Sequence, residues 1–571
     1  MKNHLALSFV IILTFLAIIG CEQKFDAESS EELNATASKP ASIKSTRPNI
    51  LLIVADDMGY SDMGAFGGEI ATPALDGLAQ DGLQLTNFHV LPTCSPTRSV
   101  LLSGTDNHLA GLGTMGEITT PEMDGIPGYA GHLNFEVVAL PELLQSEGYR
   151  TYMAGKWHLG LTEETSPYAR GFDESFALLI GGGSHWSDMR PMSPPLEMIY
   201  RRNGKRVDSL PENFYSTKYY TDILLEWMKR DQSKDAPFFA FLSFTAPHDP
   251  LHAPQKYIEK YRGKYNGGWD KLRSERFAAL KDLGIFDKDV RPFPRLPHVR
   301  PWDQLSDIER AETARNMEVY AAMVDYMDEQ IERVIAHLVQ SGEYENTLIM
   351  FFSDNGASGS DGSVMPGMSA EFMSSFDNSL DNRGLRNSYI HMGAGWAQAS
   401  MAPSRLMKAF PAEGGIKSPM LVKLPGDTEN KGTMNHAFFH VRDIMPTLLD
   451  LTGINHPKQF EGRTVLGMQG QSVLNFLEGN IEVPYEGANN VGYEFLGSKA
   501  YFDGDWKILH ISKPLGNDDW QLYNLKEDPA EINDLSLQYP DKRQELIEQW
   551  EQYKTRNKLL DITLSFPAQK E

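Results

Sequence analysis

The sequence predicts an α/β fold with a large, mostly parallel central sheet, and two patterns support this. Continuous apolar runs recur at residues 50–54, 149–154, 238–244 and 348–352, and such runs are typical of central strands buried on both faces. Amphipathic helices lie between them, and the clearest has apolar side chains at helical spacing at Tyr320, Val324, Met327, Ile331, Val334 and Leu338. Alternating strands and helices indicate helices layered on a sheet.

A boundary between two domains is predicted near residue 456. Residues 444–451 have the pattern of a helix that ends at Gly453, and Pro457 follows. Beyond this point, residues 506–509 and 520–525 are strand-like, and residues 541–558 form a polar helical segment. We expect a catalytic domain over residues 47–455 and a smaller C-terminal α+β subdomain over residues 456–571.

The first 21 residues have the features of an export signal. A basic start is followed by an apolar stretch over residues 5–20, too short to predict a spanning helix, and then by Cys21. The run Ile18-Ile19-Gly20-Cys21 is similar to a bacterial lipobox, in which the cysteine becomes the lipidated first residue. An uncleaved anchor and an ordinary cleaved signal remain as alternatives. The sequence predicts an exported lipoprotein held to a membrane through lipid on Cys21.

Residues 22–46 are rich in Ser, Glu, Ala and Lys, which predicts a flexible, solvated tether. The body would then face the periplasm or the cell surface. Glu22 follows the lipidated cysteine, and this favours the outer membrane in a Gram-negative host. Only two cysteines are present, so if Cys21 carries lipid and Cys94 has another role, no disulfide forms.

The chain has a formal net charge of −24, so its surface is acidic and nucleic-acid binding is not expected. An acidic protein that acts on an anion needs a local positive site. Such a site is indicated at the ends of the predicted strands, where ligands bind in open parallel sheets.

Each of the four predicted strands ends in polar residues that suit catalysis or metal binding. They are Asp56-Asp57, Lys156 with His158, His248, and Asp354-Asn355. Taken singly, each has a structural alternative: a helix-capping pair, a satisfied histidine or an ordinary turn. Taken together, the carboxylates and the amide form an all-oxygen set that suits a hard cation, Ca²⁺ first and Mg²⁺ second.

Cys94-Ser95-Pro96-Thr97-Arg98 has the form C-x-P-x-R and resembles the sulfatase signature. Residues 47 to about 560 resemble the Pseudomonas-type bacterial arylsulfatases of the alkaline-phosphatase-like superfamily. The matching stretches are residues 56–62, 94–104, 155–160, 353–356, 396–398, 405–408, 520–525 and 528–529. The resemblance implies the layered alkaline-phosphatase-like fold for the larger domain.

The resemblance also implies roles for individual residues. Cys94 would be oxidised to formylglycine (3-oxoalanine) by a maturation enzyme. The calcium ligands would be Asp56, Asp57, Asp354, Asn355 and an oxygen of the modified residue 94. Arg98 would fix the hydrated aldehyde, and Lys156 and Lys408 would contact sulfate. His158 would act on residue 94 and His248 on the leaving group. Lys408 follows from the resemblance alone, whereas Lys417 is interpreted as structural.

The implied reaction is hydrolysis of a sulfate monoester, carried by a small molecule or a saccharide, to an alcohol or phenol and inorganic sulfate. One hydroxyl of the hydrated aldehyde would attack sulfur, and the second would allow sulfate to be eliminated. A phosphonate monoester hydrolase or phosphodiesterase on the same scaffold is the first alternative. A lipoprotein that binds sulfated ligands without turnover is the second. The loops at residues 181–186 and 361–395 are expected to line the mouth of the site.

Overall fold

The computed structural model describes residues 47–232, 235–360, 367–426, 428, 430–485 and 489–561. The predicted export signal, the predicted lipidation site Cys21 and the predicted tether lie outside these residues. Within these ranges, no helix combines the length and the apolar character that crossing a lipid bilayer requires.

Within the described residues, eleven strands form one sheet whose centre is parallel. The parallel block runs in the order β8 (Thr347–Ser353), β1 (Asn49–Ala55), β7 (Phe238–Ser243), β3 (Arg150–Lys156) and β4 (Glu174–Leu178). The first four of these are the four predicted strands, and they are neighbours in space. The α/β prediction with a mostly parallel sheet is therefore confirmed.

Antiparallel strands complete the sheet at both edges. On one side, β9 (Lys417–Lys423) pairs with β8 and with β2 (Leu83–His89), and the short β10 (Thr433–Asn435) and β11 (Phe439–His440) pair with β2. On the other side, β5 (Tyr200–Arg202) and β6 (Lys205–Val207) form a hairpin against β4. The long central strands are thus shielded from solvent at their edges.

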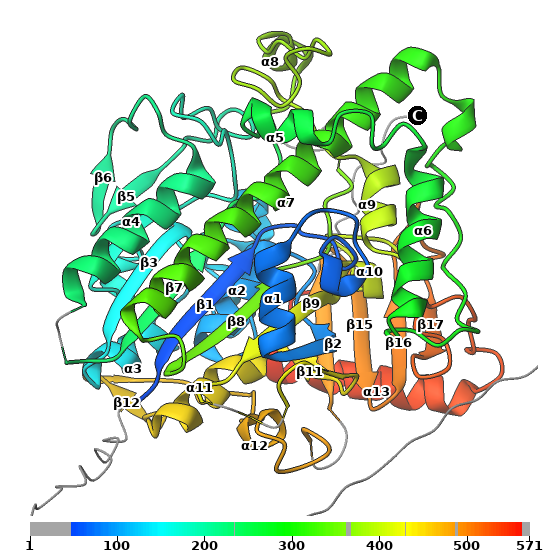
Figure 1. The fold of residues 1–571 in the computed structure, drawn as a ribbon. Helices are drawn as coiled ribbons and strands as arrows, with labels where there is room; N and C mark the ends of the chain where they lie inside the picture. Colours follow the sequence, from blue (N-terminus) through cyan, green and yellow to red (C-terminus); the bar gives the residue numbers. More distant parts are fainter. Residues whose placement is uncertain are drawn as a thin grey trace, which may run out of the picture. The chain divides into compact units, whose positions relative to one another are not determined.

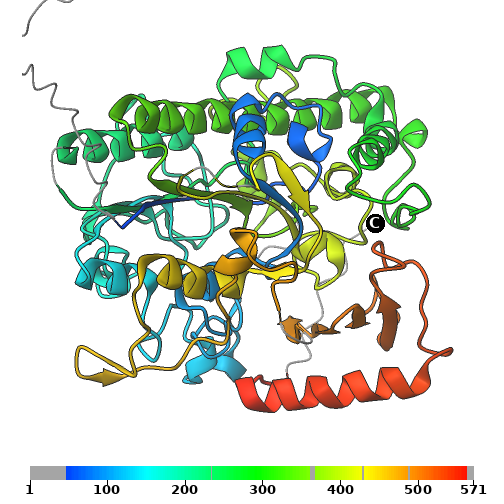
Figure 2. The same cartoon turned by 60° about the horizontal axis from the view of Figure 1, so that its bottom comes forward.

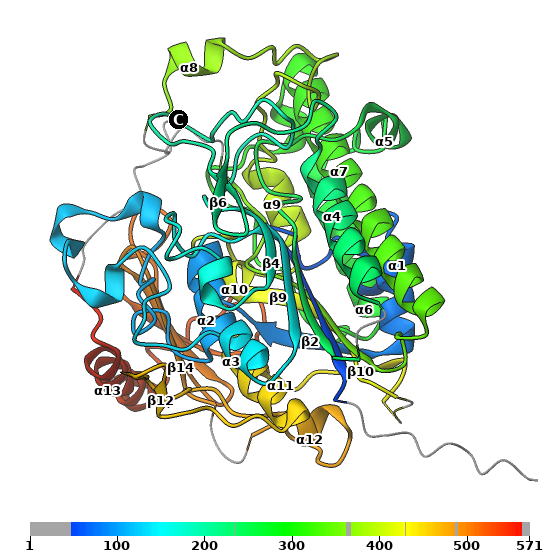
Figure 3. The same cartoon turned by 90° about the vertical axis from the view of Figure 1, so that its left-hand side faces the viewer.

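Helices cover both faces of the sheet (Figures 2 and 3). One face carries α1 (Pro73–Asp81), α4 (Ser216–Asp231), α6 (Gly268–Asp282) and α7 (Asp307–Ser341). The other carries α2 (Cys94–Ser103), α3 (Leu140–Ser146) and α11 (Ile444–Thr452). The sequence of strand β1 is continuously apolar because both of its faces are buried. Leu51 and Ile53 pack into the core on the α7 face of the sheet, and Leu52 and Val54 pack into the core on the α2 face.

Helix α7 is the predicted amphipathic helix, and it crosses the sheet as one long element (Figure 1). Ser306 caps its first turn by accepting a hydrogen bond from the Glu309 backbone, and Gly342 ends it with φ 73°. All six apolar side chains of the predicted stripe are buried. Shorter helices connect the remaining segments: α5 (Gln255–Lys260), α8 (Ala370–Ser374), α9 (Ala394–Ser400), α10 (Glu413–Ile416) and α12 (Leu474–Leu477).

A smaller antiparallel sheet follows near the C-terminus, as predicted. Its strands are β14 (Val491–Phe495), β15 (Ser498–Asp503), β16 (Trp506–His510) and β17 (Trp520–Asn524), and α13 (Pro540–Asn557) lies along it (Figure 2). A two-stranded ribbon, β12 (Gln459–Phe460) with β13 (Arg463–Thr464), precedes it. The proposed boundary near residue 456 stays a prediction.

The small sheet is joined to the segment that leads into β9 by buried charges. Lys507 Nζ lies 2.9 Å from Glu413 Oε1 and 2.6 Å from Glu531 Oε1, and all three side chains are buried. Lys417 Nζ lies 3.7 Å from the other Glu413 oxygen, which agrees with its structural interpretation. Arg405 donates to the Tyr523 hydroxyl and to Gln521, both at 2.9 Å. Residues 405–417 are therefore held by the C-terminal sheet.

Strands β3 and β7 approach so closely at Gly155 that no other residue fits. Gly155 has φ 125°, and a Cβ placed on it would lie 1.7 Å from the carbonyl oxygen of Ser243. Both the backbone conformation and the missing side chain are therefore required, because this oxygen belongs to the neighbouring strand and cannot move aside.

We predict that Gly155→Ala lowers the free energy of unfolding by about 3 kcal/mol or more, since it adds a clash to backbone strain. Urea unfolding would measure this. Gly77→Ala is the matched control, because Gly77 lies inside α1 and an added Cβ meets nothing within 4 Å. That change should stabilise the protein by about 0.5–1 kcal/mol. Equal stability of the two variants would contradict the close approach of β3 and β7.

Candidate active site

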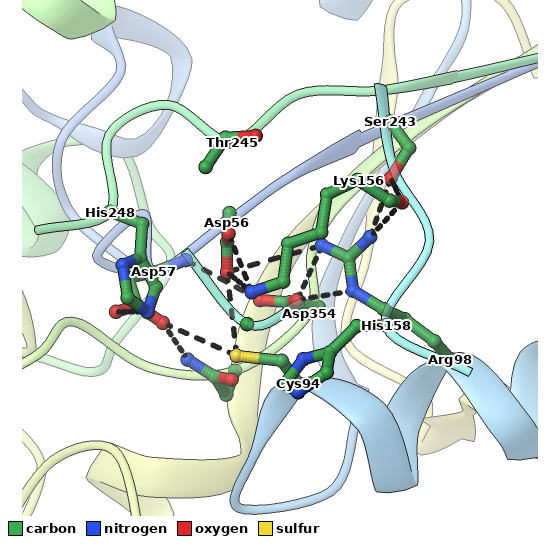
Figure 4. Close-up of polar contacts among 12 residues, drawn as sticks. Asp56, Asp57, Cys94, Arg98, Lys156, His158, Ser243, Thr245, His248 and Asp354 are labelled. Carbon is green, nitrogen blue, oxygen red and sulfur yellow. Dashed lines mark hydrogen bonds and ion pairs between the residues drawn. The ribbon is translucent and has the colours of Figure 1, made fainter. Parts of the chain in front are cut away.

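The carboxyl ends of β1, β3, β7 and β8 converge, as predicted, on one buried cluster of polar side chains (Figure 4). Asp56 and Asp57 follow β1, Lys156 ends β3, and His248 lies five residues beyond β7. Asp354 directly follows β8. The cluster also includes Cys94, which comes from the first turn of α2. Parallel neighbours place all these side chains at the same edge of the sheet.

Cys94 lies at the centre of the cluster and is 1% exposed. Its Sγ donates to Asp56 Oδ1 at 3.4 Å and to Asp57 Oδ1 at 3.9 Å, and it accepts from Lys408 Nζ at 3.3 Å. Burial and the Asp354 carboxylate raise the pKa of the Cys94 thiol far above its usual range, more than the nearby lysines lower it. The unmodified side chain is therefore a neutral thiol at pH 7 and a poor nucleophile.

Arg98 lies one helical turn after Cys94, on the same side of α2. Its guanidinium donates to Asp354 Oδ2 from Nε at 2.9 Å and from Nη2 at 2.7 Å. Nη1 donates to the Lys156 carbonyl at 2.8 Å and to Ser243 Oγ at 2.5 Å. These contacts tie α2 to the ends of β3, β7 and β8, and they explain why the motif places arginine four residues after the cysteine.

Two lysines neutralise the aspartate pair at the end of β1. Lys156 Nζ lies 2.8 Å from Asp56 Oδ2, and Lys408 Nζ lies 2.7 Å from Asp57 Oδ1. Burial raises the pKa of Asp57, but Lys408, His248 and Lys156 outweigh it and lower this pKa to about 2. Lys408, implied only by the family resemblance, thus lies inside the cluster.

The oxygen-rich part of the cluster fits a metal ion. Atoms from Asp56, Asp57, Cys94 and His248 that could act as ligands all lie within 4.8 Å of one another. Asn355 donates from Nδ2 to Asp57 Oδ1 at 2.6 Å, while its buried Oδ1 has no hydrogen-bond partner among the described residues. Burial and Asp56 raise the pKa of Asp354. An added cation would relieve this repulsion and satisfy the orphan amide oxygen.

The predicted and observed candidate ligands overlap without being identical. Asp56, Asp57 and Cys94 are common to both sets. His248 joins them in the structure, whereas Asp354, a predicted ligand, is engaged by Arg98. The assignment of Asp354 and Asn355 as metal ligands stays a prediction.

His248 lies beside the metal-binding part of the cluster, with Nε2 3.6 Å from Asp57 Oδ2. Its Nδ1 donates to the Asp249 carbonyl at 2.6 Å, which leaves Nε2 free to exchange a proton. Burial and Lys408 lower the pKa of His248 to about 3. An anionic ligand nearby would raise this pKa again, because it favours the charged imidazole.

His158 is held by a residue that the sequence did not single out. Its Nε2 lies 2.9 Å from Glu117 Oε2, and Glu117 Oε1 accepts from the Gly181 backbone at 3.0 Å. A Cβ added at Gly182 would lie 2.9 Å from His248 Nδ1. The start of the predicted loop at residues 181–186 therefore contacts both histidines, whereas residues 361–366 of the second predicted loop lie outside the described ranges.

Two residues of the site have left-handed backbone conformations that are uncommon outside glycine. Asp57 has φ 66° and His158 has φ 59°. Such conformations cost about 1–3 kcal/mol each and persist where the surrounding structure enforces them, most often at functional sites. Here they turn the chain sharply after β1 and after β3, which aims both side chains back over the sheet edge.

Comparisons with known proteins agree with this geometry. Residues 48–454 match the sulfatase family, and residues 405–556 match the C-terminal region of N-sulphoglucosamine sulphohydrolase. An uncharacterized sulfatase of Schizosaccharomyces pombe is 44% identical over 92% of this chain and 97% of its own length. An arylsulfatase of Klebsiella aerogenes is 40% identical over 75% of this chain and 91% of its own.

The fold is also shared with solved structures. The crystal structure of Ps i-CgsB in complex with k-i-k-neocarrahexaose superposes with a TM-score of 0.64 at 22% identity, over 91% of this chain and 95% of that one. Three observations indicate the same family: the polar cluster around Cys94, the family match over most of the chain, and the sequence identity to an arylsulfatase. This chain belongs to the sulfatase family and is a sulfuric ester hydrolase.

Proposed function

We propose that the enzyme hydrolyses sulfate monoesters of phenols or saccharides through Cys94 after its oxidation to formylglycine. The observation that carries this proposal is the setting of the thiol, buried among Asp56, Asp57 and Lys408 with its pKa raised. A protonated thiol gains nothing from this position, whereas a hydrated aldehyde would supply an oxygen nucleophile and a second hydroxyl for releasing sulfate.

The charge of the cluster favours an anionic substrate once a metal is bound. The carboxylates of Asp56, Asp57 and Asp354 are offset by Arg98, Lys156 and Lys408, so the protein groups alone are formally neutral. A divalent ion would leave a net charge of +2 in a buried site within an acidic protein. That local charge would attract the sulfate ester and stabilise the charge that develops on its oxygens.

We propose Ca²⁺ as this ion, with Mg²⁺ as the second choice. Asp56, Asp57 and Asn355 would hold it, together with Asp354 and an oxygen on residue 94. Oxygen ligands of this number suit Ca²⁺, whose coordination is larger and more flexible than that of Mg²⁺. When bound, the ion would supply Lewis-acid stabilisation of sulfate oxygens.

The lysines and histidines would divide the remaining tasks. Lys156 pairs with Asp56 and Lys408 pairs with Asp57, and both ammonium groups would contact the sulfate oxygens as point charges. The anionic ester would favour the charged imidazole of His248, whose Nδ1 proton is held by the Asp249 carbonyl, and Nε2 would then protonate the departing alcohol or phenol. His158 would act as a base toward residue 94. A phosphonate monoester carries the same single charge, but the sulfatase family match and the arylsulfatase relative favour the sulfate ester.

We predict that Cys94→Ala and Cys94→Ser lower kcat by about 10³-fold or more, since neither can form the hydrated aldehyde. Both variants should still unfold cooperatively, because only a small side chain changes. Mass spectrometry of the wild-type peptide that contains residue 94 should show a loss of about 18 Da relative to cysteine. Wild-type rates of aryl sulfate hydrolysis by Cys94→Ala would exclude this nucleophile.

We predict that protein purified without chelators contains about one equivalent of Ca²⁺ and that Asp57→Ala loses the metal and activity together. Elemental analysis beside an aryl sulfate assay tests this. Asp76→Ala is the control, because this carboxylate contacts Thr72 and Ala65, outside the cluster. Full metal content in Asp57→Ala, or two equivalents of zinc in the wild type, would contradict the proposed site.

We also propose that the enzyme is an exported lipoprotein with lipid on Cys21, attached to the outer membrane if the host is Gram-negative. The support is the basic start, the apolar stretch and the lipobox-like run that ends at Cys21. Lipid on this residue would tether the catalytic body in the solvent beyond residue 46.

Fractionation of the native host should place the wild type with membranes and Cys21→Ser in the soluble fraction. Several acyl chains are needed for firm attachment, so loss of the lipidated residue should release the protein fully. Equal recovery of both proteins in the soluble fraction, with an N-terminus other than residue 21, would refute the anchor and leave the catalytic proposal unaffected.

A further inference from the structure

Glu117 is a partly buried carboxylate, with its side chain 18% exposed, that reaches the active site from outside the sheet. It lies in a 3-10 turn, Gly116–Ile118, that is not next to any strand in the sequence. Its two oxygens have separate partners: Oε2 is 2.9 Å from His158 Nε2, and Oε1 accepts from the Gly181 backbone N–H at 3.0 Å. No role for this residue follows from the sulfatase signature or from the matching stretches.

These contacts fix the position of the proton on neutral His158. Burial raises the pKa of Glu117, but the charge that His158 carries at low pH and the hydrogen bonds outweigh it and lower this pKa to about 2, so the carboxylate is already ionised where His158 is neutral. An ionised carboxylate only accepts hydrogen bonds, so His158 Nε2 must carry the proton. His158 Nδ1 then holds a lone pair, and this buried atom has no hydrogen-bond partner among the described residues.

The His158 ring faces the residue at which a base is needed. His158 lies two residues after Lys156, and its ring points toward the Cys94 side chain (Figure 4). Burial lowers the pKa of His158, the Glu117 carboxylate opposes this, and Lys156 and Arg98 lower the pKa further. The ring is therefore a neutral acceptor, and the adjacent carboxylate would stabilise it after it gains a proton.

We propose that Glu117 is a positioning residue that holds His158 in the tautomer whose Nδ1 accepts a proton during sulfate release. This rests on the proposed function. In that step the free hydroxyl of the sulfated hydrate at residue 94 gives its proton to Nδ1. Its O–H electron pair becomes the second bond of the aldehyde carbonyl. The bond between that carbon and the sulfate oxygen breaks, and sulfate leaves with the electron pair.

Glu117→Gln tests this role with the smallest change of shape. Two donors, the Gly181 N–H and His158 Nε2–H, converge on the carboxylate, so two acceptor oxygens are required. Glutamine supplies one oxygen and one amide. If the amide faces His158, the imidazole must place its proton on Nδ1 instead, and the base is lost.

We predict that Glu117→Gln lowers kcat for an activated aryl sulfate by about 10- to 100-fold. KM should fall in similar proportion and kcat/KM should stay within about threefold, because sulfate release follows cleavage of the ester. Sulfated enzyme should therefore accumulate and be visible by intact mass. An unchanged kcat, or a fall in kcat/KM that matches the fall in kcat, would overturn the proposal.

Glu494→Gln is the matched control. Glu494 Oε1 also accepts from a glycine N–H, Gly497, at 2.9 Å, and its Oε2 faces His108 Nε2 at 3.5 Å. The pair has the same arrangement of a carboxylate between a glycine N–H and a histidine ring, and it lies outside the active-site cluster. Burial lowers the pKa of His108, but Asp106 and Glu494 outweigh it and raise this pKa to about 9, so the control pair joins a carboxylate to a charged ring. Glu494→Gln should keep kcat within about twofold of the wild type, because no positioning role is lost. Thermal unfolding of both variants would verify that each is folded.

A spectroscopic measurement decides the tautomer without any turnover. Nitrogen NMR of histidine-labelled protein, with His158→Gln to assign the signal, should show the His158 proton on Nε2 in the wild type and on Nδ1 or exchanging in Glu117→Gln. A wild-type proton on Nδ1 would overturn the proposal. Because this readout needs no oxidised Cys94, it separates failure of the Glu117 assignment from failure of the proposed function.

Discussion

The active site depends on one constraint, the mutual neutralisation of three carboxylates and three largely buried cations at the carboxyl edge of the sheet. Asp56 pairs with Lys156, Asp57 with Lys408 and Asp354 with Arg98. An unpaired charge at this depth would cost several kcal/mol, so each partner fixes the place of the other. Cys94 lies among them, and burial, together with their charges, sets the pKa of its thiol.

The C-terminal sheet contributes to this balance from a distance. Arg405 bonds to Tyr523 and Gln521, and Glu413 bonds to Lys507 and, through its backbone N–H, to Glu531. These contacts fix the segment on either side of Lys408, where Leu406 and Ala409 adopt left-handed backbone conformations. The small sheet therefore does more than extend the core, because it holds the lysine that neutralises Asp57.

The central sheet could be predicted from the sequence because burial on both faces leaves a continuous apolar run. The polar residues directly after those runs could be placed for the same reason, since parallel strands end at one edge. The role predicted for Cys94 was inferred from a short motif, in which the spacing between the cysteine and the arginine fits one helical turn. The paired contacts within the site, such as Arg98 with Asp354, needed the structure, because 256 residues separate the partners.

The positions of Lys408 and Glu117 in the active site could not be predicted from the periodicity of the sequence. Both lie on irregular segments with no repeating pattern, and each is placed by contacts with residues distant in the sequence. The family resemblance supplied Lys408, whereas nothing in the sequence indicated Glu117. Its carboxylate is 41 residues from His158, and only the folded chain brings the two together.

The central claim is that this buried, charge-balanced cluster, with residue 94 oxidised, is built for sulfate esters. The most direct test compares kcat/KM of one enzyme sample for the sulfate ester and for a phosphonate monoester of the same phenol, with residue 94 verified as oxidised by mass spectrometry. The account predicts a higher kcat/KM for the sulfate ester. Faster hydrolysis of the phosphonate ester would contradict it.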